Sequence, residues 1–199
     1  MIGCVLLAGG KSSRMNNVDK TLLEINNKTL LSIIINKLNF DKNNIVLNTN
    51  RDPKIFEEYK LNITKDSLEN FQGPLAGILS GLEWFDSQDK NFEWMVSMPI
   101  DTPFFPNNLI EKLYKSVSQN NKLIGVAKSN GRNHPVFSIW HISIKKALID
   151  ALNNNIRKID LFTKTYQPIE VEFTSSIDQF FNINTPEDLE IAKKIFEES

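Results

Sequence analysis

Short apolar runs alternate along the chain with segments in which apolar residues recur at helical spacing. The run Ile2–Ala8 predicts a buried strand, and the apolar stripe of Thr29–Leu38 predicts a helix. The same pattern predicts further strands at Ile45–Leu47, Leu61–Thr64, Trp94–Met98, Leu123–Ala127, Val136–Trp140 and Ile169–Phe173. Further helices are predicted at Pro53–Tyr59, Pro74–Phe85 and Ile144–Leu152, after a cap at Asn107 or Asn108 as far as Val117, and after a cap at Thr185.

This alternation predicts an α/β fold, a three-layer α/β/α sandwich around a mostly parallel mixed sheet. No linker or repeat divides the 199 residues, so we expect a single domain over residues 1–199. Ligands of such sheets bind beyond the carboxyl ends of the strands. A glycine turn, Asn48, Asp66 and Asp101 each follow a predicted strand, which places them on one rim of the sheet.

The composition and charge of the chain argue against nucleic acid and membranes as partners. A net charge of −1 argues against binding to nucleic acid, which needs a basic excess. Cys4 is the only cysteine, and its place in an apolar run predicts a buried, unreactive thiol. The N-terminal residues lack the basic region of a signal peptide, and no apolar run reaches the roughly 18 residues of a membrane span. We therefore expect a cytoplasmic monomer without a membrane partner.

The turn after the first strand has the chemistry of a phosphate site. Gly9 and Gly10 let backbone N–H groups approach a ligand closely, and Lys11, Arg14 and Lys20 supply the charge that a polyphosphate needs. The spacing matches neither a Walker A loop nor a dinucleotide fingerprint. Two glycines alone are typical of an ordinary turn, but the three cations favour a site for a nucleoside triphosphate.

Acidic and amide side chains on the same rim suggest a metal site and a base site. Asp101 is the strongest catalytic candidate, because one carboxylate together with a triphosphate suits Mg²⁺. Asp66 can accept hydrogen bonds from N1–H and the exocyclic amine of guanine, and the Asn48 amide can bind a base or a ribose. The alternatives are a helix cap or local turn at Asp101 and a plain turn residue at Asp66.

Residues Leu7 to Lys20 read Leu-Ala-Gly-Gly-Lys-Ser-Ser-Arg-Met, three further residues and Asp-Lys, and resemble the signature loop of the molybdenum cofactor guanylyltransferases. These enzymes share the nucleotide-diphospho-sugar-transferase type of fold. The chain departs from the family at Asn16 and Asn17, where glycine usually follows Arg-Met, although asparagine tolerates left-handed backbone. The other landmarks follow in family order: Asn48, Asp66, Gly73–Gly77, Asp101–Phe104, His134–Pro135 and Asn182–Leu189.

The resemblance implies transfer of GMP from GTP to molybdopterin with Mg²⁺ on Asp101, release of pyrophosphate, and transient contacts with proteins that deliver or receive the cofactor. It implies three groups of site residues. The catalytic group is Asp101, Lys20 and Arg14. The nucleotide-binding group is Leu7, Ala8, Gly9, Gly10, Lys11, Lys20, Asn48, Asp66, Gly73, Pro74, Leu75 and Asp101. The acceptor-binding group is His134, Asn182 and Asn184.

Several readings stay open at this point. The glycine-rich loop also suits a cytidylyltransferase or a sugar-phosphate nucleotidyltransferase of the same superfamily, and a GTP-binding adaptor without catalysis would keep part of the site. Asn182 and Asn184 lie on one side of an extended segment, where local capping of the last helix is the alternative to an acceptor or metal role. A structural role is the alternative for His134.

Overall fold

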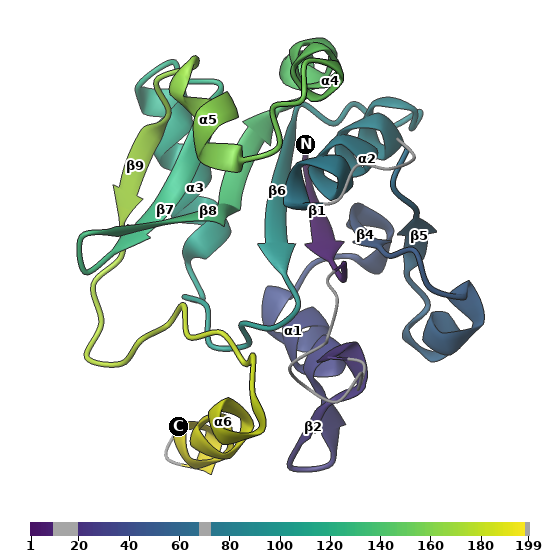
Figure 1. Ribbon diagram of the computed structural model, residues 1–199, viewed down its shortest axis with the longest axis vertical. Helices are drawn as coiled ribbons and strands as arrows, with labels where there is room; N and C mark the ends of the chain where they lie inside the picture. The colour runs from purple at the N-terminus through teal and green to yellow at the C-terminus, as the bar shows by residue number, and fades with distance from the viewer. Residues whose placement is uncertain (10–19, 68–72, 198–199) are drawn as a thin grey trace.

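The protein is described by a computed structural model, which covers residues 1–9, 20–67 and 73–197. A seven-stranded sheet lies at its centre, in the order β5-β4-β1-β6-β8-β7-β9 (Figure 1). Its strands are β1 (Ile2–Leu7), β4 (Ile45–Asn48), β5 (Asn62–Thr64), β6 (Trp94–Pro99), β7 (Ile124–Ser129), β8 (Arg132–His141) and β9 (Ile169–Glu172).

The sheet is parallel except at β8. Strand β1 pairs in parallel with β4 and β6, β4 with β5, and β7 with β9, whereas β8 runs antiparallel to both β6 and β7. The carboxyl ends of β5, β4, β1 and β6 therefore meet at one rim, and the amino end of β8 meets them there. Parallel strands need crossover connections, and helices supply them.

Helices cover both faces of the sheet and complete the three layers that the sequence predicts. Residues of α1 (Leu30–Leu38) and α3 (Leu109–Gln119) share one buried cluster with the sheet. Residues of α2 (Pro74–Asp86), α4 (Lys145–Asn153) and α5 (Ile159–Lys164) share the other. The expected α/β/α sandwich with a mostly parallel mixed sheet is confirmed. Among the described residues, no helix is long and apolar enough to cross a membrane.

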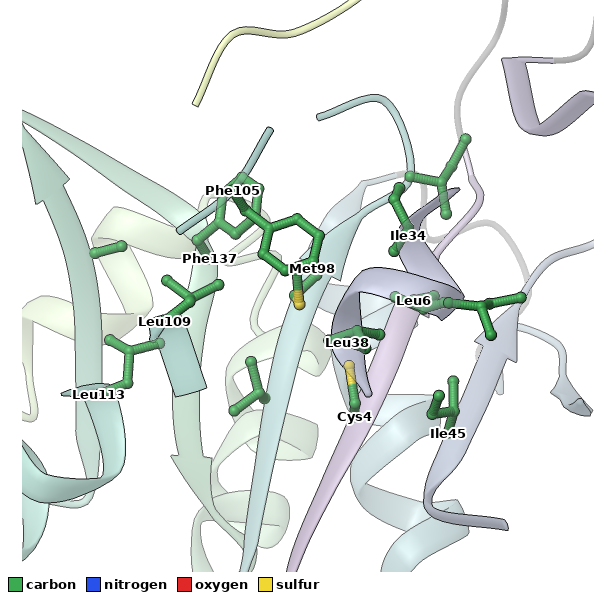
Figure 2. Packing of buried hydrophobic residues seen from close by; sticks show 14 of the residues in the cluster. Cys4, Leu6, Ile34, Leu38, Ile45, Met98, Phe105, Leu109, Leu113 and Phe137 are labelled. Atoms are coloured by element: carbon green, nitrogen blue, oxygen red, sulfur yellow. The ribbon is translucent and has the colours of Figure 1, made fainter. Parts of the chain in front are cut away.

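The first cluster shows how the central strand is buried. Cys4 and Leu6 of β1 lie beside Ile34 and Leu38 of α1, while Leu113 comes from α3 (Figure 2). Burial raises the pKa of the Cys4 thiol far above its ordinary value, because a thiolate would lose its hydration there. The expected burial of this thiol is confirmed.

Three short elements differ from the sequence prediction. The segment Pro53–Tyr59 is a 3₁₀ helix that ends at Lys60, whose φ of 53° stops helical hydrogen bonding. The hairpin of β2 (Glu24–Ile25) and β3 (Lys28–Thr29) was not predicted, because strands of two residues show no alternation. Its Asn-Asn turn has positive φ at both residues, as a two-residue hairpin requires. Helix α5 is likewise too short to show a helical period.

The C-terminal helix α6 (Pro186–Glu197) packs beyond the rim instead of on a face of the sheet. It joins the β2–β3 hairpin and the start of α1 in a third apolar cluster, which contains Ile25, Leu30, Phe104, Ile183 and Ala192. Figure 1 shows α6 and β2 at the end of the molecule to which β1 and β6 point. The chain that leads to α6 thereby crosses the rim.

Gly77 lets α2 approach the rim end of β1 and β4. A Cβ atom at this position would collide with Oδ1 of Asn48 and would lie 2.8 Å from Cδ2 of Leu7. Asn48 is itself buried, with 3% of its surface exposed. The glycine therefore provides the space that the Asn48 amide occupies, and the helix and the candidate base site depend on each other.

We expect Gly77→Ala to lower the free energy of unfolding by about 2 kcal/mol, because the added methyl group forces Asn48 or Leu7 out of place. In the Asn48→Ala background the same change should cost less, since the main colliding atom is gone. Urea unfolding of the four proteins of this double-mutant cycle measures the coupling. A stabilising Gly77→Ala change, as helix propensity alone predicts, would contradict the packing argument.

Candidate active site

The rim of the sheet brings the predicted site residues together from distant parts of the chain. Backbone hydrogen bonds extend the parallel pairing past the last strand residues: Ala8 N–H donates to the Asn48 carbonyl at 2.9 Å, and Thr49 N–H donates to the Thr64 carbonyl at 2.9 Å. The segments that carry Ala8, Asn48 and Asp66 therefore leave the sheet side by side.

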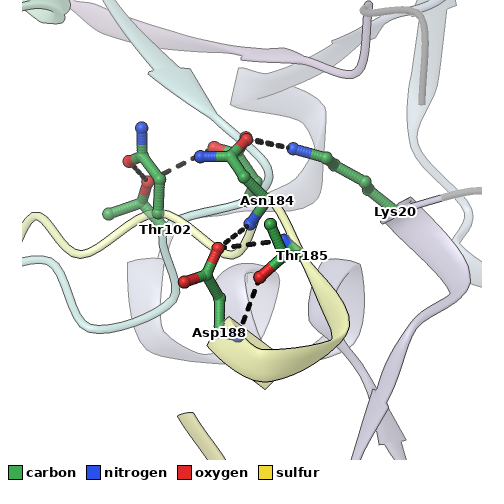
Figure 3. Close-up of polar contacts among 7 residues, drawn as sticks. Lys20, Thr102, Asn184, Thr185 and Asp188 are labelled. Atoms are coloured by element: carbon green, nitrogen blue, oxygen red, sulfur yellow. Dashed lines mark hydrogen bonds and ion pairs between the residues drawn. The ribbon is translucent and has the colours of Figure 1, made fainter. Parts of the chain in front are cut away.

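Lys20 forms an ion pair with Asp101, which follows the end of β6. Its Nζ donates to Oδ2 of Asp101 at 3.0 Å and to Oδ1 of Asn184 at 2.5 Å. The Lys20 and Asp101 side chains are each 19% exposed, so the ion pair is largely shielded but still reaches solvent. Figure 3 shows Lys20 directed at Asn184, which precedes α6.

The segment before α6 is fixed against Asp101 by two further bonds. The Ile183 N–H donates to the Asp101 carbonyl at 2.8 Å, and the buried Thr102 hydroxyl donates to Oδ1 of Asn182 at 2.6 Å. Asn182 and Asn184 thus project to the same side of an extended segment, as predicted, and both face the end of β6. Among the described residues, neither side chain forms a hydrogen bond that caps the last helix.

Asp188 and Thr185 cap the N-terminus of α6 (Figure 3). Oδ2 of Asp188 accepts from the Asn184 and Thr185 N–H groups at 2.9 Å each, and the Thr185 hydroxyl oxygen accepts from the Asp188 N–H at 3.2 Å. This is a capping box, with aspartate in place of the usual glutamate. It fixes the backbone of Asn184 and leaves the Asn184 amide free to face Lys20.

A second polar group lies at the ends of β4 and β5. Oδ1 of Asp66 accepts from the Asn48 amide at 3.1 Å, and Oδ2 accepts from the Asn50 amide at 2.8 Å. Oδ1 of the Asn50 side chain in turn accepts from the Asp66 backbone N–H at 3.1 Å. Three hydrogen bonds therefore set the direction of the Asp66 carboxylate, and each oxygen keeps a lone pair for a ligand.

Ser67 and the start of α2 lie next to this group. The Ser67 N–H donates to the Ser80 hydroxyl oxygen at 3.0 Å, and the Ser67 hydroxyl donates to Glu83. Gly73 has a φ of 137°, a backbone conformation that favours glycine, and Pro74 and Leu75 begin α2 directly after it. The predicted nucleotide-binding residues Gly73, Pro74 and Leu75 thus open a helix beside the rim.

His134 has the partners of a structural histidine. Its Nε2 lies 2.8 Å from the Ser129 hydroxyl oxygen, and its ring stacks on Phe180 at 4.2 Å between centroids. Desolvation lowers the pKa of His134, and the charge of Arg132 lowers it further, while Asp178 opposes both effects. His134 lies near the rim on β8, but no described contact joins it to Asp101, so its acceptor role stays a prediction.

Of the remaining residues predicted to bind the nucleotide, some lie in the described part of the chain and some outside it. Gly10, Lys11 and Arg14, with Asn16 and Asn17, lie outside the described residues. Leu7 is buried at the end of β1, and Gly9 is exposed after it. No other described residue comes within 4 Å of a Cβ built at Gly9.

The donor set at Asp101 fits a divalent cation that substrate phosphates help to hold. The described residues contain no cluster of three or more His, Cys, Asp or Glu side chains, which a metal site built from protein alone would need. One rim carboxylate beside amide oxygens matches the way in which Mg²⁺ is bound through few protein ligands and several phosphate or water oxygens.

The structure also identifies residues that the sequence reading missed. Asn50 holds Asp66, Thr102 holds Asn182, and Asp188 fixes Asn184, yet none of the three was predicted as a site residue. The Thr-x-x-Asp spacing of Thr185 and Asp188 is a signal for a capping box. Asn50 and Thr102 carry no comparable signal, because their roles depend on which strands become neighbours.

Comparison with known proteins identifies the family. A family model described as a MobA-like NTP transferase domain matches residues 4–166, which contain Lys20, Asp66 and Asp101. The chain belongs to this MobA-like NTP transferase family. Asn182 and Asn184 lie beyond the matched range, although they contact its residues in the fold.

Relatives named molybdenum cofactor guanylyltransferase cover nearly all of this chain, which confirms the resemblance. The protein of Rhodopseudomonas palustris (strain BisB5) is 40% identical over 196 residues, 96% of this chain and 92% of the relative. The protein of Yersinia pestis (strain Pestoides F) is 35% identical over 187 residues, 94% and 92% of the two chains.

Solved structures agree at the level of the fold. The molybdopterin-guanine dinucleotide biosynthesis protein A of Archaeoglobus fulgidus superposes with a TM-score of 0.80 at 26% identity and covers 100% of both chains. A cytidylyltransferase of Leptospira borgpetersenii, at 17% identity and a TM-score of 0.71, covers 100% of this chain and 87% of its own, and shows the fold alone. The expected nucleotidyltransferase type of fold is confirmed.

The lowered pKa of His134 predicts a pH dependence of stability. Its folded-state pKa lies below the ordinary value of 6.5, so the unfolded chain binds a proton first as the pH falls. The free energy of unfolding should therefore decrease between about pH 7.5 and about pH 5.5. Urea titrations should show a smaller decrease for His134→Phe, which keeps a ring on Phe180. An equal decrease in both proteins would contradict the assignment to His134.

Proposed function

We propose that this protein transfers GMP from GTP to molybdopterin, releases pyrophosphate and forms the guanine dinucleotide form of the molybdenum cofactor. The terminal phosphate of the acceptor attacks the α-phosphorus of GTP, and the bond from that phosphorus to the bridging oxygen of the β-phosphate breaks. The observation that carries the proposal is the rim, where the Lys20–Asp101 pair at the end of β6 and the oriented Asp66 carboxylate after β5 lie on the same edge of the sheet. The names of relatives that are 35% to 40% identical support it.

We propose that Asp66 makes the site selective for guanine over other bases. Guanine presents two adjacent donors, N1–H and the exocyclic amine, and a carboxylate accepts from both. Cytosine and adenine do not present that pair of donors. The Asn48 and Asn50 amides already donate to Asp66, so its carboxylate is oriented before a base arrives.

Lys20 and Asp101 are proposed to act on the triphosphate and the metal. The Lys20 ammonium has three N–H bonds and uses two for Asp101 and Asn184, which leaves one for a phosphate oxygen. Asp101 is proposed to hold Mg²⁺, which neutralises phosphate charge when bound. Lys11 and Arg14 are proposed to join Lys20 at the leaving pyrophosphate. The acceptor phosphate is already anionic, so catalysis rests on positioning and charge, without a strong general base.

The acceptor is proposed to bind beside Asp101 on the side of α6. Asn182 and Asn184 face that position and are fixed by Thr102, Lys20 and the capping box of Asp188. His134 is proposed to line the far part of this pocket. We further propose that the whole chain forms a single transferase domain, that it acts as a cytoplasmic monomer, and that partner proteins deliver and receive the cofactor transiently.

Pyrophosphate release in the presence of molybdopterin, Mg²⁺ and each of GTP, CTP, UTP and ATP tests this proposal. GTP should give the highest kcat/KM, and mass spectrometry should find the guanine dinucleotide as the product. A preference for CTP or UTP would indicate a cytidylyltransferase or a sugar-phosphate enzyme instead. Tight GTP binding with no pyrophosphate release would indicate the adaptor without catalysis.

We expect Asp101→Asn to lower kcat about a thousandfold or more, because the change removes the charge that would hold the metal. GTP binding should change far less, since Lys20 and the base site remain. Asp150→Ala, which removes an exposed carboxylate on α4, is the matched control and should keep wild-type turnover. Steady-state kinetics and GTP titration measure both effects. Near-normal turnover by the Asp101→Asn protein would refute the catalytic assignment.

Asn50→Ala should reduce nucleotide discrimination and leave phosphate binding intact. Without the Asn50 amide, Asp66 loses the donor to Oδ2 and the acceptor for its N–H, so only the Asn48 amide still orients its carboxylate. We expect the ratio of kcat/KM for GTP over CTP to fall about tenfold. Asn62→Ala on β5 removes an exposed amide and should leave the ratio unchanged. An unchanged ratio in Asn50→Ala would contradict the role of Asn50.

A further inference from the structure

A cavity of about 960 Å³ lies behind the loop that carries Asp101. It is an open cavity bordered by α1, the loop after β6, the start of α3, the segment after β9 and the last turn of α6. Lys20, Asp101, Asn182 and Asn184 are not among its lining residues. The cavity is therefore separate from the candidate active site, although Pro103 and Phe104 of the loop form part of its wall.

The charged side chains described in the lining of the cavity are all positive. Lys28, Lys37 and Lys112 line it, and among the residues that the structure describes no aspartate or glutamate does. In the described part of the chain none of the three lysines forms an ion pair. Lys37 and Lys112 are half-buried, so their charges have lost part of their hydration without gaining a carboxylate. Desolvation accordingly lowers the pKa of Lys37.

The two half-buried lysines are held in place by other contacts. Nζ of Lys37 lies 5.0 Å from the centre of the Phe105 ring. Nζ of Lys112 lies 4.8 Å from the centre of the Phe173 ring and donates to the Glu172 carbonyl at 2.6 Å. Contacts with rings and carbonyls orient an ammonium but do not neutralise it. Each lysine keeps donors for an anion.

Besides the lysines, the lining combines uncharged polar side chains with apolar and aromatic ones. Ile33, Phe104 and Phe173 are buried and contribute to the wall, and Phe196 of α6 adds another ring. Flat aromatic walls favour a flat ring as ligand. The volume lies in the range of sites for small molecules, which favours a small ligand over a protein segment.

We propose that this cavity binds a small organic anion in which a flat ring carries a phosphate, sulfonate or carboxylate group. The ring lies against Phe104 and Phe173, and the anionic group accepts hydrogen bonds from Lys37 and Lys112. Bound there, the ligand lies against Pro103 and Phe104 of the loop that also carries Asp101. The site is distinct from that for GTP, and its existence does not depend on the proposed transfer reaction.

The test uses the full chain and anilinonaphthalene sulfonate, a fluorescent aromatic anion, without any nucleotide. We expect saturable binding at one site, and about tenfold weaker binding to Lys37→Gln and to Lys112→Gln. Lys115→Gln removes a lysine of α3 that does not line the cavity, so it should bind like the wild type. Uncharged anilinonaphthalene should bind about tenfold more weakly than its sulfonate.

Three results would overturn the proposal. The first is equal binding of the charged and uncharged probes, which would mean that the lysines play no part. The second is loss of binding in Lys20→Gln together with normal binding in Lys37→Gln and Lys112→Gln, which would place the probe at the phosphate site. The third is binding of a hexaglutamate peptide without binding of the sulfonate, which would make the cavity a docking site for an acidic peptide.

Discussion

The ion pair between Lys20 and Asp101 joins three parts of the chain that are far apart in sequence. Lys20 follows the signature loop, Asp101 follows β6, and Asn184, which shares the Lys20 ammonium, precedes α6. Because the pair lies where parallel strands end, its position follows from the sheet. Its orientation follows from the segment before α6, which Thr102 and the capping box of Asp188 hold against Asp101.

A second constraint sets the base side of the rim. Asp66 is oriented by Asn48 and Asn50, and Asn48 occupies space that exists because position 77 has no side chain. The close packing of α2 at Gly77 and the direction of the Asp66 carboxylate therefore depend on the same side chain, Asn48. The two constraints place a charged region for the phosphates and a carboxylate for base recognition on the same rim of the sheet, the arrangement that nucleotidyl transfer requires.

The layers, the parallel sheet and the rim were predictable from the sequence, because long apolar runs and helical stripes are local signals. Asp66, Asp101 and Lys20 were found because their residue types and their places after strands indicate phosphate and metal chemistry. The β2–β3 hairpin and α5 are too short to carry a period. Asn50 and Thr102 could not be found, since a hydrogen bond to Asp66 or Asn182 exists only once separate strands and loops have come together.

The most direct test of this account is a crystal structure of the protein with GTP and Mg²⁺ bound. The account predicts the guanine edge on the Asp66 carboxylate, with N1–H and the exocyclic amine within hydrogen-bond distance of its oxygens. It also predicts the metal on Asp101 and a phosphate oxygen on the Lys20 ammonium. A base bound away from Asp66, or a triphosphate that contacts neither Lys20 nor a metal on Asp101, would contradict it.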